Sequence, residues 1–515
     1  MLELFRNESL SDFADPARAA AYREALAAVR LRLGGHRPLI IGGEAVDTEK
    51  KIVSLNPARP AEVVGTVAAA TAKEADQALD AAWRAFPGWG ALPAAERAAA
   101  ILKLAGEIRR HKFELAAWET LEASKNWVEA EADVAEAIDF CEYYARQAIE
   151  LAQPLPLQPL PGESAEAWLQ PLGAGVVIPP WNFPLAILVG MVIGPVAAGN
   201  TVVVKPSSYT PVVAAAFMEA VAAAAIPPGV INFLPGGGGE VGDHLVDHVR
   251  TRFVNFTGSR EVGVRIAERS AQVKPGQTWL KRAYMEMGGK DAIVVDETAD
   301  LDAAVPQIIH SAFDYQGQKC SAASRLIVVE AVYAQVLDRV VAAAGRLQVG
   351  PAEDNFPVAA VISAAQHGAI LAEIERARSQ ANLVLGGQAV DRDGGYYLEP
   401  TIFAGVPPES RLAQQEIFGP VLAVIRARDF DEAVQIFNGT DYGLTGGLFS
   451  RSRERIERAK RELYVGNLYI NRKITGALVG THPFGGFKMS GTNAKAGGPD
   501  YLRLFLEMKS VAEHL

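Results

Sequence analysis

A single cysteine in a polar setting is the residue of this chain best suited to covalent chemistry. Cys320 lies in FDYQGQKCSAASR, residues 313–325, and is one of two cysteines in 515 residues. A lone cysteine is most often a small core hydrophobe, but QGQKCS is not a core sequence. The neighbouring cation of Lys319 would favour the thiolate, which is the nucleophilic form. The sequence leaves two roles open for Cys320, a buried structural thiol and a nucleophile.

Two further side chains have the chemistry to assist such a nucleophile. Glu286 lies between methionines in YMEMGGKD, and apolar surroundings raise the pKa of a carboxyl group toward the range of a general base. An ion pair at a strand end is the alternative for Glu286. Asn182 follows two prolines at the end of a predicted strand, in VVIPPWNFP, where an amide can donate to a developing oxyanion. An ordinary turn is the alternative for Asn182.

Candidate anion sites follow other predicted strands. Lys205 ends the predicted strand in VVVKPSS, and Ser259 begins a predicted helix in FTGSREVG, where free N–H groups can hold a phosphate. GGGGEVG, residues 236–242, satisfies G-x-G-x-x-G after a strand, but the acidic residue expected about 20 positions later is missing. Turns, helix caps and a surface lysine account for the same patterns without a ligand.

Composition and charge exclude several classes of function. A chain of 515 residues is too long for one hydrophobic core, so we expect two or three domains, and 49% hydrophobic and 21% charged residues are typical of a folded protein. The net charge of −10 comes without a basic cluster for nucleic acid. The first 20 residues lack an export signal, and the apolar run 185–199 is too short for a membrane span and predicts a buried helix. Two cysteines without a CxxC pair indicate free thiols, so we expect a cytoplasmic protein with no membrane partner, nucleic-acid partner or metal site.

The elements that would position these residues follow from periodicity. Up to about residue 150, apolar residues recur at three and four positions, which predicts long packed helices. A Pro-rich segment ends this block near residue 163. After Gly173, and again after Gly288, short β-branched runs alternate with helical ones, which predicts two mostly parallel α/β sheets. The last twenty residues alternate like a strand and have no local partner, so we expect an edge shared with another domain or subunit.

Seven segments, in order, resemble the aldehyde dehydrogenase superfamily along nearly the whole chain: PWNFP, KPSS, FTGS, EMGGK, GQKCSAASR, EIFGPV and PFGGFKMSG. The resemblance implies an α/β fold of two Rossmann-like domains with a small β element for oligomerisation. It implies a nucleotide-binding domain at residues 1–136 and 164–286, a catalytic domain at 287–485, and the oligomerisation element at 137–163 and 486–515. A homodimer or an assembly of dimers is expected.

The resemblance also implies an NAD(P)-dependent oxidation of an aldehyde. Cys320 would be the nucleophile that forms a thiohemiacetal and then a thioester, Asn182 and the Cys320 N–H the oxyanion hole, and Glu286 the base that activates water. The four-glycine turn is then expected to pack close to the pyrophosphate. The residues implied to bind the cofactor are Ile178, Pro179, Pro180, Trp181, Lys205, Ser207, Ser208, Gly238, Gly258, Ser259, Val262, Gly288, Glu416 and Phe418.

Cofactor choice rests on one departure from the family pattern. Ser208 stands where many NAD-preferring members carry a glutamate that binds the adenosine ribose. A carboxylate would repel a 2′-phosphate and a serine would not. We therefore expect NADP to be accepted alongside NAD.

Within the superfamily, NFTGSREVG, AYMEMGGKDAIVVDETAD and NRKITGALVGTHPFGG are most similar to bacterial members that oxidise L-glutamate γ-semialdehyde to L-glutamate. This aldehyde forms from Δ1-pyrroline-5-carboxylate in proline degradation. It carries a carboxylate and an ammonium far from the aldehyde, so its pocket needs anion donors opposite Cys320, a partner for the ammonium and apolar side walls. The residues implied to bind it are Glu136, Phe183, Lys319, Ser321, Gly476, Ala477 and Phe484. A salt bridge on a helix face is an equal alternative for Glu136.

Other functions stay open at this point. A dehydrogenase for another carboxylated semialdehyde, such as succinate semialdehyde, would share the same motifs. A Cys/Glu pair with an oxyanion hole could hydrolyse esters without a cofactor, and a scaffold could keep the fold without catalysis. A proline dehydrogenase is a candidate partner.

Overall fold

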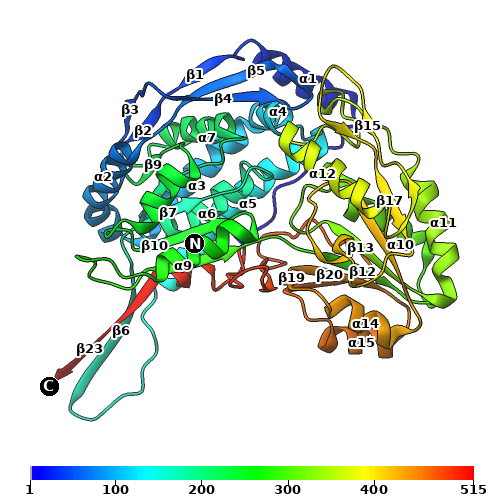
Figure 1. The fold of residues 1–515 in the computed structure, drawn as a ribbon. Coiled ribbons are helices and arrows are strands. Elements are labelled where there is room, and N and C mark those ends of the chain that lie inside the picture. The colour runs from blue at the N-terminus through cyan, green and yellow to red at the C-terminus, as the bar shows by residue number, and fades with distance from the viewer. Residues whose placement is uncertain (1–2) are drawn as a thin grey trace.

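Two seven-stranded sheets from different parts of the chain form the frame of the structure, a computed structural model that describes residues 3–515 (Figure 1). The first sheet is parallel except at β2 and β3, which pair antiparallel at one edge. In sheet order its strands are β11 (Arg282–Glu286), β10 (Phe253–Thr257), β7 (Ala174–Ile178), β8 (Thr201–Val204), β9 (Ile231–Phe233), β2 (Leu39–Ile41) and β3 (Glu44–Val46).

Helices cover both faces of this sheet (Figure 1), which is why β7 and β8 are continuous apolar runs with every residue buried. The predicted buried helix within residues 185–199 is confirmed as α6. The helices are α1 (Pro16–Arg30), α2 (Ala72–Ala91), α3 (Ala94–Arg110), α4 (Lys112–Ala123), α5 (Trp127–Leu151), α6 (Ala186–Ala197), α7 (Pro211–Ala223), the π-turn η1 (Gly238–Gly242), α8 (Asp243–Asp247) and α9 (Arg260–Ala271). A separate sheet has the order β1 (Gly35–Arg37), β5 (Arg59–Ala68) and β4 (Lys51–Asn56).

The second large sheet is parallel except for its edge strand β14. Its order is β14 (Asn382–Leu385), β17 (Thr401–Ala404), β18 (Val421–Ala427), β13 (Ala323–Val329), β12 (Asp291–Val295), β20 (Thr445–Phe449) and β21 (Asn467–Ile470). Its helices are α10 (Leu301–Phe313), α11 (Tyr333–Ala344), α12 (Ala364–Ala377), α13 (Arg411–Gln414), α14 (Phe430–Asn438) and α15 (Arg453–Glu462). The short elements are η2 (Asp314–Gly317), η3 (Glu330–Val332), η4 (Ala352–Asp354), β15 (Ala389–Val390), β16 (Tyr397–Leu398), β19 (Tyr442–Gly443), β22 (Phe487–Lys488) and η5 (Tyr501–Phe505).

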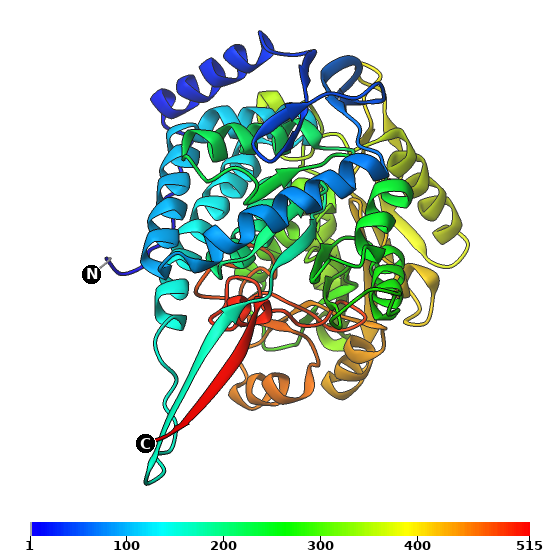
Figure 2. The same ribbon diagram turned by 90° about the vertical axis from the view of Figure 1, so that its left-hand side faces the viewer.

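A two-stranded ribbon projects from the body, with the C-terminus at its far end (Figures 1 and 2). It pairs β6 (Glu163–Pro171) antiparallel with β23 (Leu506–His514). The predicted C-terminal strand is therefore confirmed, and its partner is a distant segment of the same chain. The boundary predicted at residue 136 falls inside α5, which runs unbroken from Trp127 to Leu151.

No helix within residues 3–515 is long and apolar enough to cross a membrane. In the same range, no three or more His, Cys, Asp or Glu side chains are grouped so as to hold a metal ion.

Candidate active site

The loop that carries Cys320 has a backbone that few residues adopt. Between α10 and β13, Tyr315, Gln316 and Gly317 have φ values of 50°, 55° and 66°, a left-handed conformation that costs free energy for residues other than glycine. Their surroundings hold them there. The Tyr315 hydroxyl donates to the Ala123 carbonyl at 3.1 Å, and the Gln316 amide donates to two further carbonyls, of Ser124 and Ala360. Such backbone is typical of functional sites.

Close packing of backbone explains the paired glycines after Glu286. A Cβ on Gly289 would lie 2.5 Å from the carbonyl oxygen of Cys320, and a Cβ on Gly288 would overlap the Glu416 carboxylate. The Gly289 N–H donates to Glu416 Oε1 at 2.9 Å. The motif EMGGK therefore brings three loops together at the ends of their strands, where open parallel sheets bind ligands.

Glu286 lies at the end of β11, with its carboxylate held by backbone donors. Oε1 accepts from the Ala494 N–H at 3.1 Å and Oε2 from the Gly486 N–H at 3.4 Å. Burial outweighs these two hydrogen bonds and raises the pKa of Glu286 to about 8. The predicted upward shift is confirmed, and the alternative of a strand-end ion pair is not found, since no described cation lies within 4.0 Å of this carboxylate.

Asn182 is buried beside the cysteine loop. Its Nδ2 donates to the Gln318 carbonyl at 3.0 Å, which uses one of the two amide hydrogens and leaves the second as a donor. This contact ties the loop after β7 to the residue two positions before Cys320. The side chain is therefore in reach of the cysteine loop, as an oxyanion donor has to be.

The expectation that Lys319 favours the Cys320 thiolate is wrong. Lys319 Nζ pairs with Glu129 Oε2 at 2.6 Å, so its charge is already neutralised. Burial, followed by the nearby carboxyl groups of Asp291 and Glu416, raises the pKa of the Cys320 thiol well above its usual value. Cys320 is nevertheless partly exposed, whereas Cys141 is fully buried. Access and the groups around it distinguish Cys320 as the nucleophile candidate.

A cleft of about 640 Å³ opens beside the cysteine, and all fourteen residues predicted to bind the cofactor line it. Lys205 is buried there, and burial lowers its pKa to about 8. Ser259 is the N-cap of α9, and its side-chain oxygen accepts from the Val262 N–H. The positive end of this helix therefore faces the cleft. The Trp181 and Phe418 rings lie edge to face, 5.4 Å between centroids.

A second cavity, of about 110 Å³, also reaches Cys320 and Glu286. Six of the seven residues predicted to bind the substrate line it: Glu136, Phe183, Ser321, Gly476, Ala477 and Phe484. Lys319 does not, because its side chain turns to Glu129, so this prediction is corrected.

Two observations in that cavity concern charge. Glu136 makes no ion pair within 4.0 Å with any described residue, so the alternative of a helix-face salt bridge is not found. Burial raises its pKa to about 8. The N–H groups of Gly476 and Ala477 donate to no acceptor in residues 3–515. Besides Glu286, the cavity therefore offers a second acid without an ion pair, Glu136, and two unused backbone donors.

Comparison with known proteins identifies the family. A model of the aldehyde dehydrogenase family matches residues 44–511. The chain belongs to this family. A 1-pyrroline-5-carboxylate dehydrogenase of Geobacillus kaustophilus is 52% identical over 514 residues, which is 100% of both chains. A crystal structure of 1-pyrroline-5-carboxylate dehydrogenase from Thermus with bound NAD matches with a TM-score of 0.99, 57% identity and full coverage of both chains.

A longer protein contains the same fold. Proline utilization A from Bdellovibrio bacteriovorus matches with a TM-score of 0.97 and 47% identity, covering 99% of this chain and 53% of that one. These likenesses confirm the fold class expected for an aldehyde dehydrogenase, with two α/β sheets and a small β element.

Sequence reasoning missed part of this candidate site. Phe140 lines the smaller cavity and lies four residues after Glu136 on α5, so helical spacing was an available signal. Asn255, Phe256 and Ile417 lie inside the quoted motifs NFTGSREVG and EIFGPV, so their neighbours were an available signal, whereas the other missed residues lie outside the quoted motifs. In the cavity the missed residues include Ile187, Met191, Asn255, Ala496 and Tyr501, and in the cleft Tyr209, Phe256, Gln366 and Ile417.

Proposed function

We propose that this aldehyde dehydrogenase oxidises L-glutamate γ-semialdehyde to L-glutamate with NAD. One observation carries the proposal. The cavity that reaches Cys320 and Glu286 is also lined by the unpaired acid Glu136 and by the unused N–H groups of Gly476 and Ala477. A substrate with an aldehyde at one end and an ammonium and a carboxylate at the other matches those groups. Full-length relatives named 1-pyrroline-5-carboxylate dehydrogenase support it.

Cys320 begins the reaction in this proposal. The thiol must first lose its proton, because its pKa is raised and only the thiolate attacks a carbonyl carbon. Sulfur bonds to that carbon, and the carbonyl oxygen becomes an oxyanion. The free N–H of the Asn182 amide stabilises this charge. The product on the enzyme is a thiohemiacetal.

Glu286 completes the reaction. Once the thiohemiacetal carbon has been oxidised to a thioester, water must attack it. The ionised Glu286 carboxylate takes a proton from that water, the C–S bond breaks, and Cys320 leaves as a thiolate. Its pKa of about 8 makes it a stronger base than an exposed glutamate. The released product is a carboxylic acid.

The far end of the substrate is bound by charge and backbone donors. Glu136 has no ion-pair partner in the protein, and the substrate ammonium supplies one. This positive charge favours the ionised form of the Glu136 carboxylate. The N–H groups of Gly476 and Ala477 donate to the substrate carboxylate. Phe183 and Phe484 cover its aliphatic middle. These contacts make an uncharged aldehyde a poorer substrate.

NAD fits the larger cleft on the chemistry of its lining. Buried Lys205, the N-terminus of α9 at Ser259 and the carboxylate of Glu416 are suited to ribose hydroxyls and a pyrophosphate. When bound, NAD supplies the acceptor for the hydride that leaves the thiohemiacetal carbon. We also propose that NADP is accepted, because Ser208 lines this cleft without a charge that would repel a 2′-phosphate.

A panel of aldehydes with both nucleotides tests these proposals. L-Glutamate γ-semialdehyde should have a higher kcat/KM than succinate semialdehyde, which lacks the ammonium, and than pentanal, which lacks both charges. Equal kcat/KM values for L-glutamate γ-semialdehyde and succinate semialdehyde would contradict the substrate assignment and favour a dehydrogenase for another carboxylated semialdehyde. NADP rates below about a thousandth of NAD rates, a difference of about 4 kcal/mol, would contradict the second proposal. Ester hydrolysis without nucleotide at a comparable rate would favour the esterase alternative.

Assembly is proposed from the projecting ribbon. Trp168 on β6 and Met508 and Val511 on β23 expose apolar surface, which a second copy would cover. We propose a homodimer or an assembly of dimers, tested by sedimentation at micromolar concentration, where monomer alone would contradict it.

We further propose that the first sheet belongs to a nucleotide-binding domain and the second to a catalytic domain. The free thiols of Cys141 and Cys320 support a cytoplasmic location.

A proline-oxidising partner is proposed from chemistry and from one neighbour. The proposed substrate arises when proline is oxidised and its ring then opens, so a proline dehydrogenase must supply it. A protein named proline utilization A contains this fold within a chain of nearly twice the length. Co-purification with a proline dehydrogenase, or its absence, tests this pairing.

A further inference from the structure

The segment before the first helix joins two walls of the substrate cavity. Residues 3–12, here termed the N-terminal strap, have no regular secondary structure. Two of the cavity's walls are α5, which carries Glu136 and Phe140, and residues 474–482, here termed the anchor loop, which carries Gly476 and Ala477. These walls are more than 320 positions apart in the sequence. Their spacing decides whether one substrate reaches both Glu136 and the loop.

Asn7 on the strap bridges those walls directly. Its Nδ2 donates to Asp139 Oδ2 at 2.8 Å and to the Val479 carbonyl at 3.1 Å. Asp139 lies on α5 one turn after Glu136, and Val479 lies two positions after Ala477. Both amide hydrogens are used, so one side chain ties the helix to the loop.

Neighbouring contacts hold the strap in this position. The Glu8 N–H donates to Asp139 Oδ1 at 2.6 Å, so the Asp139 carboxylate receives the strap through both oxygens. Burial raises the pKa of Asp139 to about 6, which leaves it ionised at neutral pH. The Phe5 ring lies edge to face with Tyr143 of α5 and against Gly480, where an added Cβ would come within 3.0 Å of the ring.

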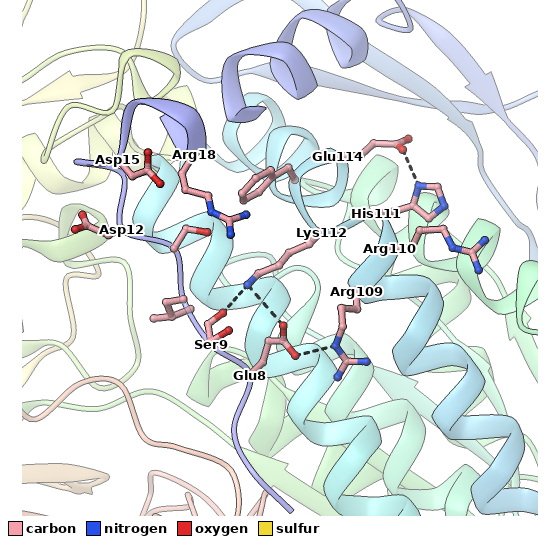
Figure 3. Close-up of a pocket in the computed structure, with 13 residues that line it drawn as sticks. Glu8, Ser9, Asp12, Asp15, Arg18, Arg109, Arg110, His111, Lys112 and Glu114 are labelled. Carbon is pink, nitrogen blue, oxygen red and sulfur yellow. Dashed lines mark hydrogen bonds and ion pairs between the residues drawn. The ribbon is translucent and has the colours of Figure 1, made fainter. Parts of the chain in front are cut away.

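Beyond Asn7 the strap is attached to helices alone. Figure 3 shows Glu8 reaching Arg109 and Lys112, and Lys112 donating to the Ser9 carbonyl. Ser11 donates through its N–H and its hydroxyl to Glu131 of α5. Within residues 3–12, Asn7 alone makes a hydrogen bond to the anchor loop.

We propose that Asn7 is a positioning residue for substrate specificity, which sets the distance between α5 and the anchor loop so that Glu136 and the loop N–H groups grip one substrate. This rests on the proposed function. Asn7 touches neither Cys320 nor Glu286, so its loss weakens the grip on the charged end of the substrate and leaves the chemical steps alone. The effect therefore falls on KM for a charged aldehyde.

The test compares Asn7→Ala with Ser11→Ala, which removes a strap contact to the same helix but none to the loop. For Asn7→Ala, KM for L-glutamate γ-semialdehyde should rise about fivefold, the effect of one or two lost hydrogen bonds. Its kcat, and kcat/KM for pentanal, should stay within about twofold of the unsubstituted protein. Ser11→Ala should leave all three constants unchanged. An equal loss for both aldehydes, or no change for either, would overturn the proposal.

Amide exchange gives a readout that does not depend on the substrate. The Gly480 N–H donates to the Gly497 carbonyl at 2.9 Å, so it reports opening of the anchor loop. Exchange in residues 474–482 should be faster in Asn7→Ala and unchanged in Ser11→Ala. Unchanged exchange in both would refute the strap's role. Faster exchange, together with no preference of the unsubstituted protein for the charged aldehyde, would refute the proposed substrate and leave the strap's mechanical role supported.

Discussion

Replacing Glu286 by glutamine separates the two halves of the proposed reaction. Glutamine has nearly the same shape and can accept from one of the two N–H groups, of Ala494 and Gly486, that hold the carboxylate. It cannot take a proton from water. General-base catalysis contributes about 10²–10⁴ in rate, so we expect steady-state kcat of Glu286→Gln to fall by that factor, about 2.7–5.4 kcal/mol. Thioester formation should continue.

The pH dependence follows from the raised pKa of Glu286. Only the ionised form is a base, and with a pKa of about 8 roughly a tenth of the carboxyl groups are ionised at pH 7. Where hydrolysis limits turnover, kcat should rise about tenfold per pH unit below pH 8 and level off above it. Glu286→Gln should lack this rise.

Stopped-flow recording of NADH measures both effects. The variant should release about one equivalent of NADH per active site in a fast burst, followed by slow turnover. Glu375→Gln, at an exposed carboxylate that pairs with Arg378 on the surface, is the matched control and should behave like the unsubstituted protein. A kcat for Glu286→Gln within about threefold of that protein, or loss of the burst together with the turnover, would refute the assignment of Glu286 as the hydrolytic base.

Three substitutions and one chemical modification test other groups of the site. Inactivation of the cofactor-free protein by iodoacetamide should keep accelerating through pH 9, because the pKa of Cys320 is raised. An inactivation rate that levels off below pH 8 would show a lowered pKa instead. Cys320→Ala should abolish NADH production. Asn182→Ala should lower kcat/KM by about 10²–10³, as for loss of one oxyanion donor, with the thermal unfolding midpoint recorded to detect loosening of the loop at Gln318. Ser208→Glu should lower kcat/KM with NADP at least about tenfold through charge repulsion without lowering it for NAD, and equal losses for both nucleotides would contradict the proposed role of Ser208.

Much of the site could be predicted because its constraints are local in sequence. The paired glycines after Glu286 are required by backbone that passes close to Cys320 and Glu416. Continuous apolar runs predict buried parallel strands, and the loops after such strands meet at one edge of a sheet. The cofactor residues follow these strands in order, so their order along the chain resembles the family even though each motif alone has an ordinary structural explanation.

Side-chain direction and charge pairing could not be predicted in the same way. Lys319 is next to Cys320 in sequence, but its ammonium pairs with Glu129, and the thiol is left among buried carboxyl groups. Glu136 looked equally suited to a helix-face salt bridge, yet no described cation reaches it. A pKa depends on burial and on charges within a few ångströms, most of which come from distant segments.

The sequence by itself determined the family and predicted a nucleophile, a base and the cofactor loops, because motif spacing and hydrophobic period are local properties of the chain. Only the tertiary structure decided that Asn7 lies between Asp139 and Val479, that the Gly476 and Ala477 N–H groups are unused, and that β23 pairs with β6. These contacts join residues hundreds of positions apart. No local pattern encodes them, since they depend on how both sheets and their helices pack.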